Sequence, residues 1–495
     1  MKTNIISLIL VVTTVIASTS CSDDFLEQTP TDAVSAESAT ATTGNLFLVI
    51  NGIHRLLYTR QNSNGRGGIS AMMIQNEVLG EDMVMNARAN GWWINMASWN
   101  DHTNATDTDD RHAWRVLYKV IKNANIVIEG AENAVGPDEE RNAALGQALA
   151  FRAFAHFQMV QLYAQRYDAA GSNSQMGIPL VTDNSIEGKP RATVEEVYTQ
   201  INADLDAAIT RLEGYERSNT SHINQNVAMG LKARVSLVQG NYAIAAQMAA
   251  AAREAFPLMD SITYASGFND YTIDEWMWGG HYNEEQGSTF TNFHAWVSRN
   301  FSSSNIRGNP KSINSLLHDL IPVTDVRSAI FDPTGDHLNL PPGIVISSRH
   351  QRFPYTNQKF LAFSTGDSRG DVPYMRAAEM YLIEAEAKAR LGEADAADAL
   401  FPLAVARDAA YVLSANTGQA LVDEILLQRR WELWGEGFRF FDLKRLNMAL
   451  DRNGANHNAA LINNIMFVPA GDVRWQWQIP QDELDANPAI KQNPS

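Results

Sequence analysis

Apolar residues recur along much of this chain with the spacing of a helix. An early run is Leu46, Ile50, Ile53 and Leu57. The same spacing returns in residues 114–128 and 145–162. Such spacing gives a helix one apolar face, which other helices must cover. The pattern therefore predicts a predominantly all-α protein.

The clearest local pattern is a helical hairpin in residues 227–257. An apolar stripe is followed by a break at Gly240 and then by an alanine-rich helix that Pro257 ends. The small residues Ala233 and Ala245 stand where the two helices of a hairpin cross closely, as in a tetratricopeptide repeat. We therefore expect a tetratricopeptide-like hairpin here.

Further copies of this hairpin are expected elsewhere in the chain. Residues 374–407 carry the same spacing, with Gly392 at the turn and the small residues Ala385 and Ala397 at the crossing. Residues 146–170 are a less regular candidate. Because one hairpin cannot bury its own apolar face, we expect the hairpins to stack into a partial solenoid scaffold.

Two long regions lack this periodicity. Residues 62–110 and 258–373 are rich in Gly and Asn, and the second is also punctuated by proline. Long irregular segments on a rigid scaffold usually carry function, since binding residues are often placed on loops. We therefore expect these two regions to hold the ligand-binding loops.

Aromatic residues gather in the two irregular regions, namely Trp92, Trp93, Trp99, Trp276, Trp278, Tyr282 and Trp296. Sugar rings stack on such side chains, and a nearby amide such as Asn95 can bind hydroxyl groups. Alternatively, large loops need small cores of their own, which Trp commonly fills. We expect about three of the seven to contact ligand. Trp92, Trp93 and Trp278 should be the exposed ones because glycines flank them.

The segment Arg429–Arg445 alternates acids, arginines and aromatics, so it could be mistaken for a catalytic cluster. On a helix, Glu432, Glu436 and Arg439 would fall at i, i+4 and i+7 and could pair. Structural ion-pair networks perturb pKa values as readily as active sites do. We interpret six residues as a structural network: Arg429, Glu432, Glu436, Arg439, Asp442 and Arg445.

Charge and composition narrow the function. A formal charge of −17 over 495 residues argues against nucleic-acid binding and favours an uncharged or cationic ligand. The single cysteine excludes cysteine-rich metal sites, and the chain lacks H-E-x-x-H, G-x-S-x-G and Walker motifs, so no cofactor is implied. A glycosidase needs only two suitably spaced carboxylates and stays open.

The acidic run Asp107–Asp110 could bind Ca²⁺ through its oxygens. An isolated acidic loop is more often solvated, so no metal site is predicted from it.

The N-terminus has the pattern of a bacterial lipoprotein signal. Lys2 precedes an apolar stretch from Ile5 to Ile16, and small residues then lead to Cys21, the only cysteine. This stretch is shorter than the roughly 20 residues that span a bilayer. We expect residues 1–20 to be removed, Cys21 to be lipidated, residues 21–42 to form a tether, and 43–495 to form one body.

Several motifs, in this order, resemble the SusD/RagB family of outer-membrane lipoproteins of the Bacteroidetes. They are CSDDFLE at 21–27, WRVLY at 114–118, AFRAF at 150–154, GIPLV at 177–181, PRATVEEVY at 190–198, YMRAAEMYLI at 374–383, and the segment 429–445. The resemblance covers most of the chain. It implies tetratricopeptide-like hairpins and a looped ligand-binding half.

The resemblance also implies a function that the composition alone does not define. It implies a non-enzymatic lipoprotein that faces the cell exterior, binds an oligosaccharide and delivers it to a SusC-type TonB-dependent transporter, over which it acts as a lid. Two alternatives stay open, namely an oligopeptide receptor of the same family and a surface glycoside hydrolase. No family motif identifies the aromatic candidates.

Overall fold

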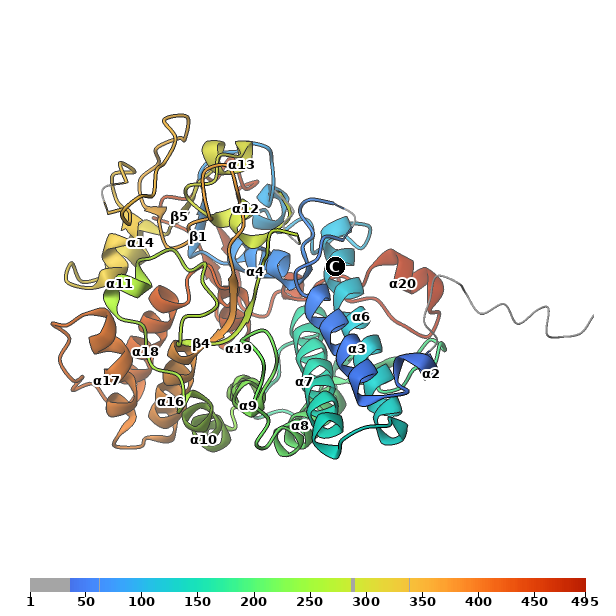
Figure 1. Cartoon of the computed structure of the whole chain (residues 1–495). Coiled ribbons are helices and arrows are strands. Elements are labelled where there is room, and N and C mark those ends of the chain that lie inside the picture. Colours follow the sequence, from blue (N-terminus) through green and yellow to red (C-terminus); the bar gives the residue numbers. More distant parts are fainter. Residues whose placement is uncertain (1–35, 62, 286–289, 338) are drawn as a thin grey trace, which may run out of the picture.

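The computed structural model describes residues 36–495, apart from 62, 286–289 and 338. Long helices form the lower and right-hand parts of the molecule in Figure 1, and short strands and small helices lie above them. The predicted signal segment and Cys21 lie outside the described residues. No helix in the described part is long and apolar enough to cross a membrane.

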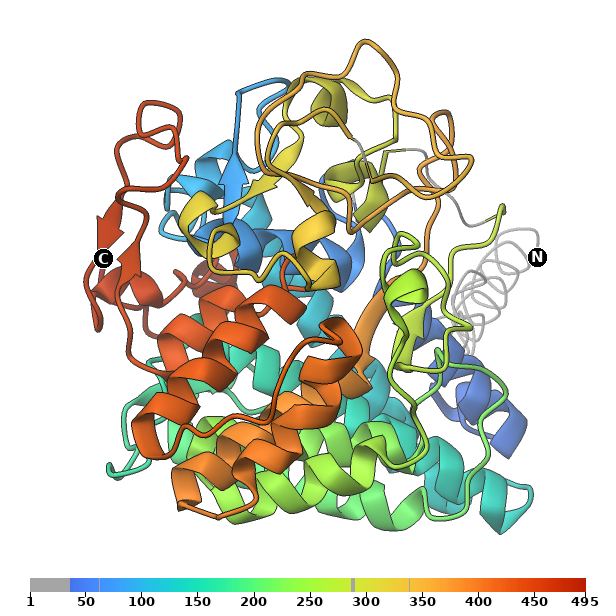
Figure 2. The same cartoon turned by 90° about the vertical axis from the view of Figure 1, so that its left-hand side faces the viewer.

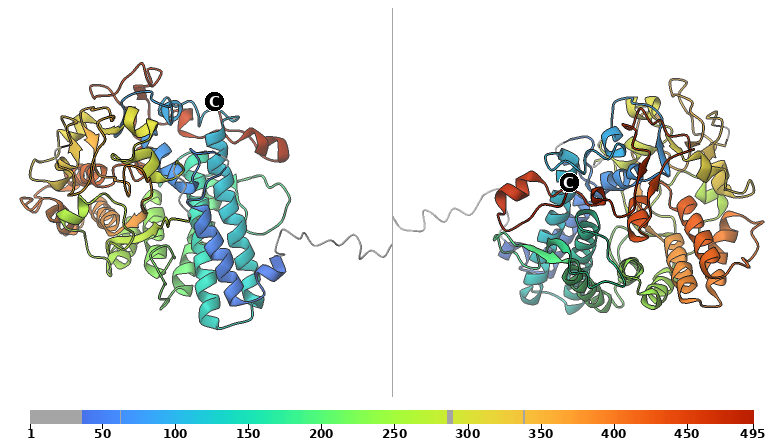
Figure 3. Two further views of the ribbon diagram at one scale, coloured as in Figure 1. Left: turned by 45° about the horizontal axis from the view of Figure 1, so that its top comes forward. Right: turned by 180° about the vertical axis from the view of Figure 1, so that it is seen from behind.

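The long helices pack in a continuous row. They are α3 (Thr43–Leu56), α6 (Thr108–Gly130), α7 (Asp138–Tyr163), α8 (Val194–Arg211), α9 (Gln225–Gln239), α10 (Tyr242–Arg253), α16 (Ala377–Leu391), α17 (Ala396–Arg407) and α18 (Gly418–Glu432). Each of α6, α7, α8, α9 and α10 packs against the next, and α16 continues the row from α10 to α17 and α18. Helix α3 lies alongside α6 and α7 (Figure 3). The row is the solenoid-like scaffold that the periodicity predicts.

Glycine forms the turn of two helical pairs. Helix α9 ends at Gly240 and α16 ends at Gly392, with φ of 75° and 74°, the left-handed region that glycine adopts most easily. The crossing residues Ala233 and Ala245 are both fully buried. The pairs α9–α10 and α16–α17 therefore lie where the sequence pattern indicates hairpins.

The third predicted hairpin, in residues 146–170, is wrong. Helix α7 runs unbroken from Asp138 to Tyr163 and pairs with α6 and α8 instead. A Cβ atom at Gly146 would lie 2.6 Å from Leu212 beside α8. This glycine therefore permits a close approach of two helices rather than a turn.

The short strands join the two irregular regions. Strands β1 (Met83–Met85), β5 (Lys311–Ile313), β7 (Thr356–Asn357) and β6 (Phe331–Asp332) form one antiparallel sheet in that order. Because β1 belongs to the first region and the other three to the second, the regions form one unit. It lies above the helical row in Figure 2.

Three further strand pairs complete the backbone: β2 (Met176–Pro179) with β3 (Arg191–Thr193), β4 (Trp276–Gly280) with β8 (Val372–Arg376), and β9 (Leu450–Asp451) with β10 (Phe467–Val468). The shorter helices are α2 (Ala36–Ala39), α4 (Gly68–Leu79), α5 (Ile94–Ala97), α11 (Ser261–Tyr264), α12 (Phe293–Val297), α13 (Ser304–Gly308), α14 (Ser315–His318), α15 (Val326–Ala329), α19 (Arg439–Arg445) and α20 (Gln481–Ala486), with 3-10 turns η2 (Ala131–Asn133) and η3 (Val473–Trp475).

Helix α4 is a difference from the sequence analysis, which expects only loops in residues 62–110. Every residue of α4 is buried. A helix that is covered on all sides needs no polar face, so it lacks the periodicity by which exposed helices are recognised.

Candidate functional site

The structure buries six of the seven aromatic residues predicted to bind ligand. Exposed fractions are 5 % for Trp93, 3 % for Trp99, 1 % for Trp276, 0 % for Trp278, 5 % for Tyr282 and 0 % for Trp296. Trp92 is half-buried, and Asn95 is exposed. The prediction that Trp93 and Trp278 are exposed is therefore wrong, while Trp92 keeps a surface that a ligand can reach.

The glycines beside these tryptophans have a different role from the one expected. Trp278 packs among the rings of Phe151, Phe154 and Tyr374, and its indole nitrogen donates to the carbonyl of Ser221 at 3.0 Å. A Cβ atom on Gly279 would lie 3.0 Å from the ring of Trp276. Gly279 therefore lets a large ring pack closely instead of exposing one.

The other indoles also fill cores within the loops. Trp93 and Trp296 meet edge to face with ring centroids 5.6 Å apart, and Trp99 meets Trp475 at 4.8 Å. The nitrogen of Trp99 donates to the carbonyl of Leu79 at 3.0 Å. The alternative considered above, that large loops need aromatic cores of their own, describes these residues.

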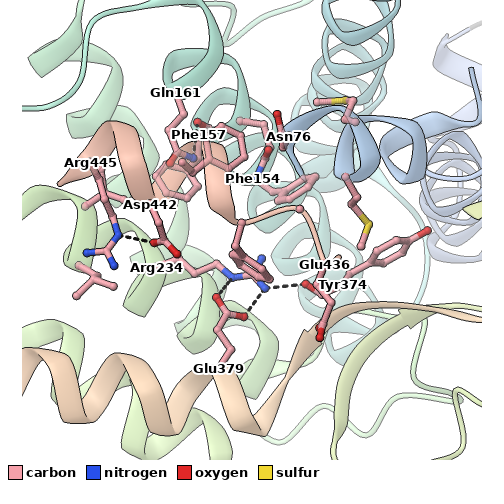
Figure 4. Close-up of a pocket in the computed structure, with 18 of the residues that line it drawn as sticks. Asn76, Phe154, Phe157, Gln161, Arg234, Tyr374, Glu379, Glu436, Asp442 and Arg445 are labelled. Atoms are coloured by element: carbon pink, nitrogen blue, oxygen red, sulfur yellow. Dashed lines mark hydrogen bonds and ion pairs between the residues drawn. The ribbon is translucent and has the colours of Figure 1, made fainter. Parts of the chain in front are cut away.

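The six residues interpreted as a structural network do form buried ion pairs. Arg429 pairs with Asp442 at 2.7 Å, and Arg445 pairs with Asp442 at 2.7 Å and with Glu386 at 2.8 Å. Arg439 pairs with Glu81. Figure 4 shows the pair between Arg445 and Asp442 beside a cavity of about 90 Å³. That volume is well below the roughly 300–1,000 Å³ of typical ligand pockets.

The partners within this network differ from those that the spacing indicates. Glu432, Glu436 and Arg439 do not pair with one another, because α18 ends at Glu432 and α19 begins only at Arg439. Instead, Arg376 at the end of β8 binds Glu432 at 3.0 Å and Glu436 at 2.6 Å. Arg407 binds Glu432 at 3.0 Å. The network therefore ties separate elements together rather than stabilising one helix.

The arginines keep the buried carboxyl groups ionised. Burial alone would raise their pKa values, but the guanidinium groups of Arg407 and Arg376 hold the pKa of Glu432 well below its ordinary value. In the same way, Arg429 and Arg445 lower the pKa of Asp442 to about 2. Both carboxylates are thus paired with buried arginines of the scaffold, which fits a structural role.

A larger depression lies between the end of α3, the segment before α9 and the β4–β8 pair. We call it the α3 groove; its volume is about 540 Å³, within the usual range for ligand pockets. Its lining is Asn51, His54, Arg55, Leu57, Tyr58, Ser218, Asn219, Ser221, His222, Tyr271, Gly279, Gly280, His281, Asn283 and Tyr374. Another cavity, of about 430 Å³ beside α19, includes Trp475, which is only 5 % exposed.

Helix α3 supplies one wall of the groove. Asn51, His54, Arg55 and Tyr58 are spaced at i, i+3, i+4 and i+7, which places them along one stripe of the helix. The apolar stripe that begins at Leu46 faces the core. The polar stripe is therefore free to line the groove, and Tyr58 remains half-buried.

A stacked pair of rings supplies the facing wall. Tyr271 and His281 lie 4.3 Å apart at an interplanar angle of 28°. Asp371 fixes both, because its carboxylate accepts from the backbone N–H of Tyr271 at 2.9 Å and contacts Nδ1 of His281 at 2.9 Å. It also accepts from the backbone N–H of Tyr282 at 3.0 Å. The stack is thus held rigid from behind.

Two histidines meet at the base of the groove. The rings of His54 and His222 lie 4.7 Å apart, and Nε2 of His54 and Nδ1 of His222 make no hydrogen bond within the described residues. Burial, together with the nearby His222, lowers the pKa of His54 to about 3. Burial also lowers the pKa of His222. Both rings are therefore neutral near pH 7 and can act as hydrogen-bond donors or acceptors.

The groove combines ring faces with polar side chains. Tyr58 and Tyr271 are half-buried and His281 is exposed, so their rings offer partly accessible faces. Asn51, Asn219 and Ser218 lie among them. Apolar faces with a few converging amide and hydroxyl groups are what a sugar ring requires, because its C–H face stacks while its hydroxyl groups form hydrogen bonds.

Sequence reasoning singles out Tyr282, which follows the groove residue His281, but misses Tyr58, Tyr271 and His281. The polar stripe on α3 was a usable signal, since it stands beside the apolar stripe. The Tyr271–His281 stack had no local signal, because it depends on Asp371, 90 residues or more further along the chain.

Residues 342–495 match the SusD family, and residues 34–237 match a family described as starch-binding and associating with the outer membrane. The chain belongs to the SusD/RagB family. Members of this family bind carbohydrate and are not catalysts.

Solved structures share the whole fold. A SusD-like carbohydrate-binding protein from Bacteroides vulgatus is 26 % identical, with a TM-score of 0.79 over 91 % of this chain and 97 % of that one. A laminarin-binding SusD-like protein is 20 % identical, with a TM-score of 0.70 over 92 % and 99 %. A surface glycan-binding protein from Bacteroides uniformis is 19 % identical, with a TM-score of 0.70 over 91 % and 99 %. No curated protein sequence matches the chain.

Proposed function

We propose that this protein binds an oligosaccharide in the α3 groove without transforming it. The observation that carries the proposal is the pairing of ring faces from Tyr58 and from the Tyr271–His281 stack with amide side chains in a groove of about 540 Å³. Membership of a glycan-binding family supports the same ligand class. Trp92, half-buried in the loop before α5, is a second candidate contact.

The charge of the groove refines the ligand class. The titratable side chains that line it are basic residues and tyrosines. The basic ones are Arg55, which is exposed, and the histidines His54, His222 and His281. The carboxylate of Asp371 lies behind His281 and partly balances this set. The whole-chain charge of −17 favours an uncharged or cationic ligand, but the local lining favours neutral or acidic sugars. Local charge decides, since salt screens distant charges.

The membrane anchor and the transporter partner are proposed from the N-terminal signal pattern and from the resemblance to the SusD/RagB family. A lipid on Cys21 holds the body at the outer face of the outer membrane, and the family's association with that membrane supports this location. The bound sugar passes to a SusC-type TonB-dependent transporter, over which the protein acts as a lid. Copurification of such a transporter with the tagged protein from solubilised membranes tests this; recovery of the protein alone would contradict it.

Isothermal titration separates the candidate ligands. The full-length protein in detergent is titrated with neutral oligosaccharides, acidic oligosaccharides and oligopeptides, and the solutions are then analysed for products. We expect saturable binding of an oligosaccharide with no product. Binding only of peptides would favour the oligopeptide receptor, and release of shorter sugars would favour the glycoside hydrolase.

A further inference from the structure

The α3 groove differs from the rest of the molecule in its charge. The chain holds 56 Asp and Glu residues against 39 Lys and Arg residues, yet neither Asp nor Glu is among the residues that line the groove. Glu284 and Glu285 follow the lining residue Asn283 along the chain, but both are exposed and neither belongs to the lining. The groove is therefore a local exception in an acidic protein.

Arg55 carries a permanent positive charge in this lining. It lies in the last turn of α3 and is exposed. Within the part of the chain that the structure describes, its guanidinium group makes no ion pair and no hydrogen bond. Burial raises the pKa of Tyr58, and the positive charge of Arg55 opposes that rise, which places the guanidinium group close to this ring. An unpaired fork of N–H donors thus stands beside a ring face on which a sugar can stack.

A second arginine lies behind the groove without an acidic partner. Arg217 is half-buried and donates to the backbone carbonyl of His222 at 3.0 Å and to that of Met277. Among the described residues no carboxylate pairs with it. Burial lowers the pKa of Arg217 only to about 10, so the group stays charged near pH 7. Its charge adds to burial in lowering the pKa of His222, which shows that positive charge reaches the base of the groove.

Asp371 is the carboxylate that contacts the lining, and its oxygens are already engaged. It contacts Nδ1 of His281 and accepts from the backbone N–H groups of Tyr271 and Tyr282. Its side chain is only 9 % exposed. Asp371 therefore supplies one negative charge from behind the ring stack, against two positive charges from the arginines.

We propose that the α3 groove selects an oligosaccharide that carries a negative charge, as a carboxylate or a sulfate, and that Arg55 determines this selection. The inference rests on the proposed function, since it names the charge of the sugar bound at the same site. Carboxylate and sulfate groups project from the edge of a sugar ring, so a ring stacked on Tyr58 can present one to Arg55. A guanidinium fork binds two such oxygens at once.

Isothermal titration with ligands that differ only in charge tests this inference. The full-length protein in detergent is titrated with oligogalacturonides and with carrageenan oligosaccharides. Each is compared with its uncharged form, obtained by methyl esterification or by desulfation, and with neutral oligosaccharides of glucans and xylans. We expect the tightest binder to be acidic, and removal of its charge to weaken binding at least about ten-fold. The carboxylate and sulfate arms show which anion is preferred.

Variants of Arg55 connect the preference to this side chain. Arg55→Gln should weaken binding of the acidic ligand about ten-fold and leave binding of its uncharged form unchanged, because only the first loses a charge-assisted hydrogen bond. Arg55→Lys should retain part of the affinity, since it keeps the charge but not the fork. Arg349→Gln, which changes another exposed arginine outside the groove, should bind as the parent does.

The outcomes separate this inference from the proposed function. A neutral oligosaccharide as the tightest binder, or an equal loss for charged and uncharged ligands in Arg55→Gln, would overturn the inference and leave the proposed function in place. Saturable binding of no sugar at all would contradict the proposed function itself. Should a variant fail to fold, the matched pairs of ligands, measured on the parent protein, still decide.

Discussion

At the scale of single residues, Arg376 is central to the scaffold. It is fully buried and binds Glu275, directly before β4, together with Glu432 and Glu436, at the end of α18 and in the turn after it. Removing one partner from a buried ion-pair network leaves the others uncompensated, at a cost of about 3–5 kcal/mol. Arg376 therefore contributes to stability mainly because its removal would leave three buried carboxylates without its charge.

We predict that Arg376→Met lowers the free energy of unfolding by about 3–5 kcal/mol, measured by urea denaturation. Arg352→Met is the matched control, because Arg352 pairs with Asp336 where both side chains are more than half exposed. The control should cost less than about 1 kcal/mol. Equal losses in the two variants would show that the buried network is not what holds these segments together.

The residue scale also shows where sequence reasoning ends. The segment around Glu432 was recognisable as a network from its alternating charges, but its partners Arg376 and Arg407 were not, because helix spacing describes only neighbours on one helix. The exposure of Trp93 and Trp278 was predicted wrongly for a related reason. A flanking glycine indicates freedom of the backbone, and only the fold shows whether that freedom exposes a ring or buries it.

At the scale of elements, the helical pairs were predictable and α4 was not. Gly240 and Gly392 end their helices in a left-handed conformation that other residues adopt only at a cost. The position of each turn can therefore be predicted from the local sequence. Helix α4 is buried on every side and leaves no periodic trace. The same holds for the sheet that joins β1 to β5, whose pairing spans more than 200 residues.

The two turn glycines differ in one measurable respect. A Cβ atom at Gly240 would lie 2.9 Å from Ala169, whereas at Gly392 no atom lies within 4 Å. We predict that Gly392→Ala costs about 1 kcal/mol, from the left-handed backbone alone. Gly240→Ala should cost about 1 kcal/mol more because of the added contact. Thermal unfolding measures both, and equal costs would contradict the role given to that contact.

At the scale of the whole molecule, a helical row supports a unit built from two irregular regions. The row was predictable from periodicity and from the resemblance to the SusD/RagB family. The α3 groove was not, because its walls come from α3, from the segment before α9, and from residues fixed by Asp371. Sequence patterns describe each wall separately, and only the fold brings the walls together.

The central claim is that the α3 groove binds the sugar, and alanine substitutions measured by isothermal titration test it most directly. Tyr58→Ala and Tyr271→Ala should each weaken the affinity for the bound oligosaccharide about ten-fold, which corresponds to about 1.4 kcal/mol of lost stacking. Tyr242→Ala, which removes a half-buried tyrosine outside the groove, should leave it unchanged. Unaltered affinity in both groove variants, with the loss found instead in Trp92→Ala, would contradict the account.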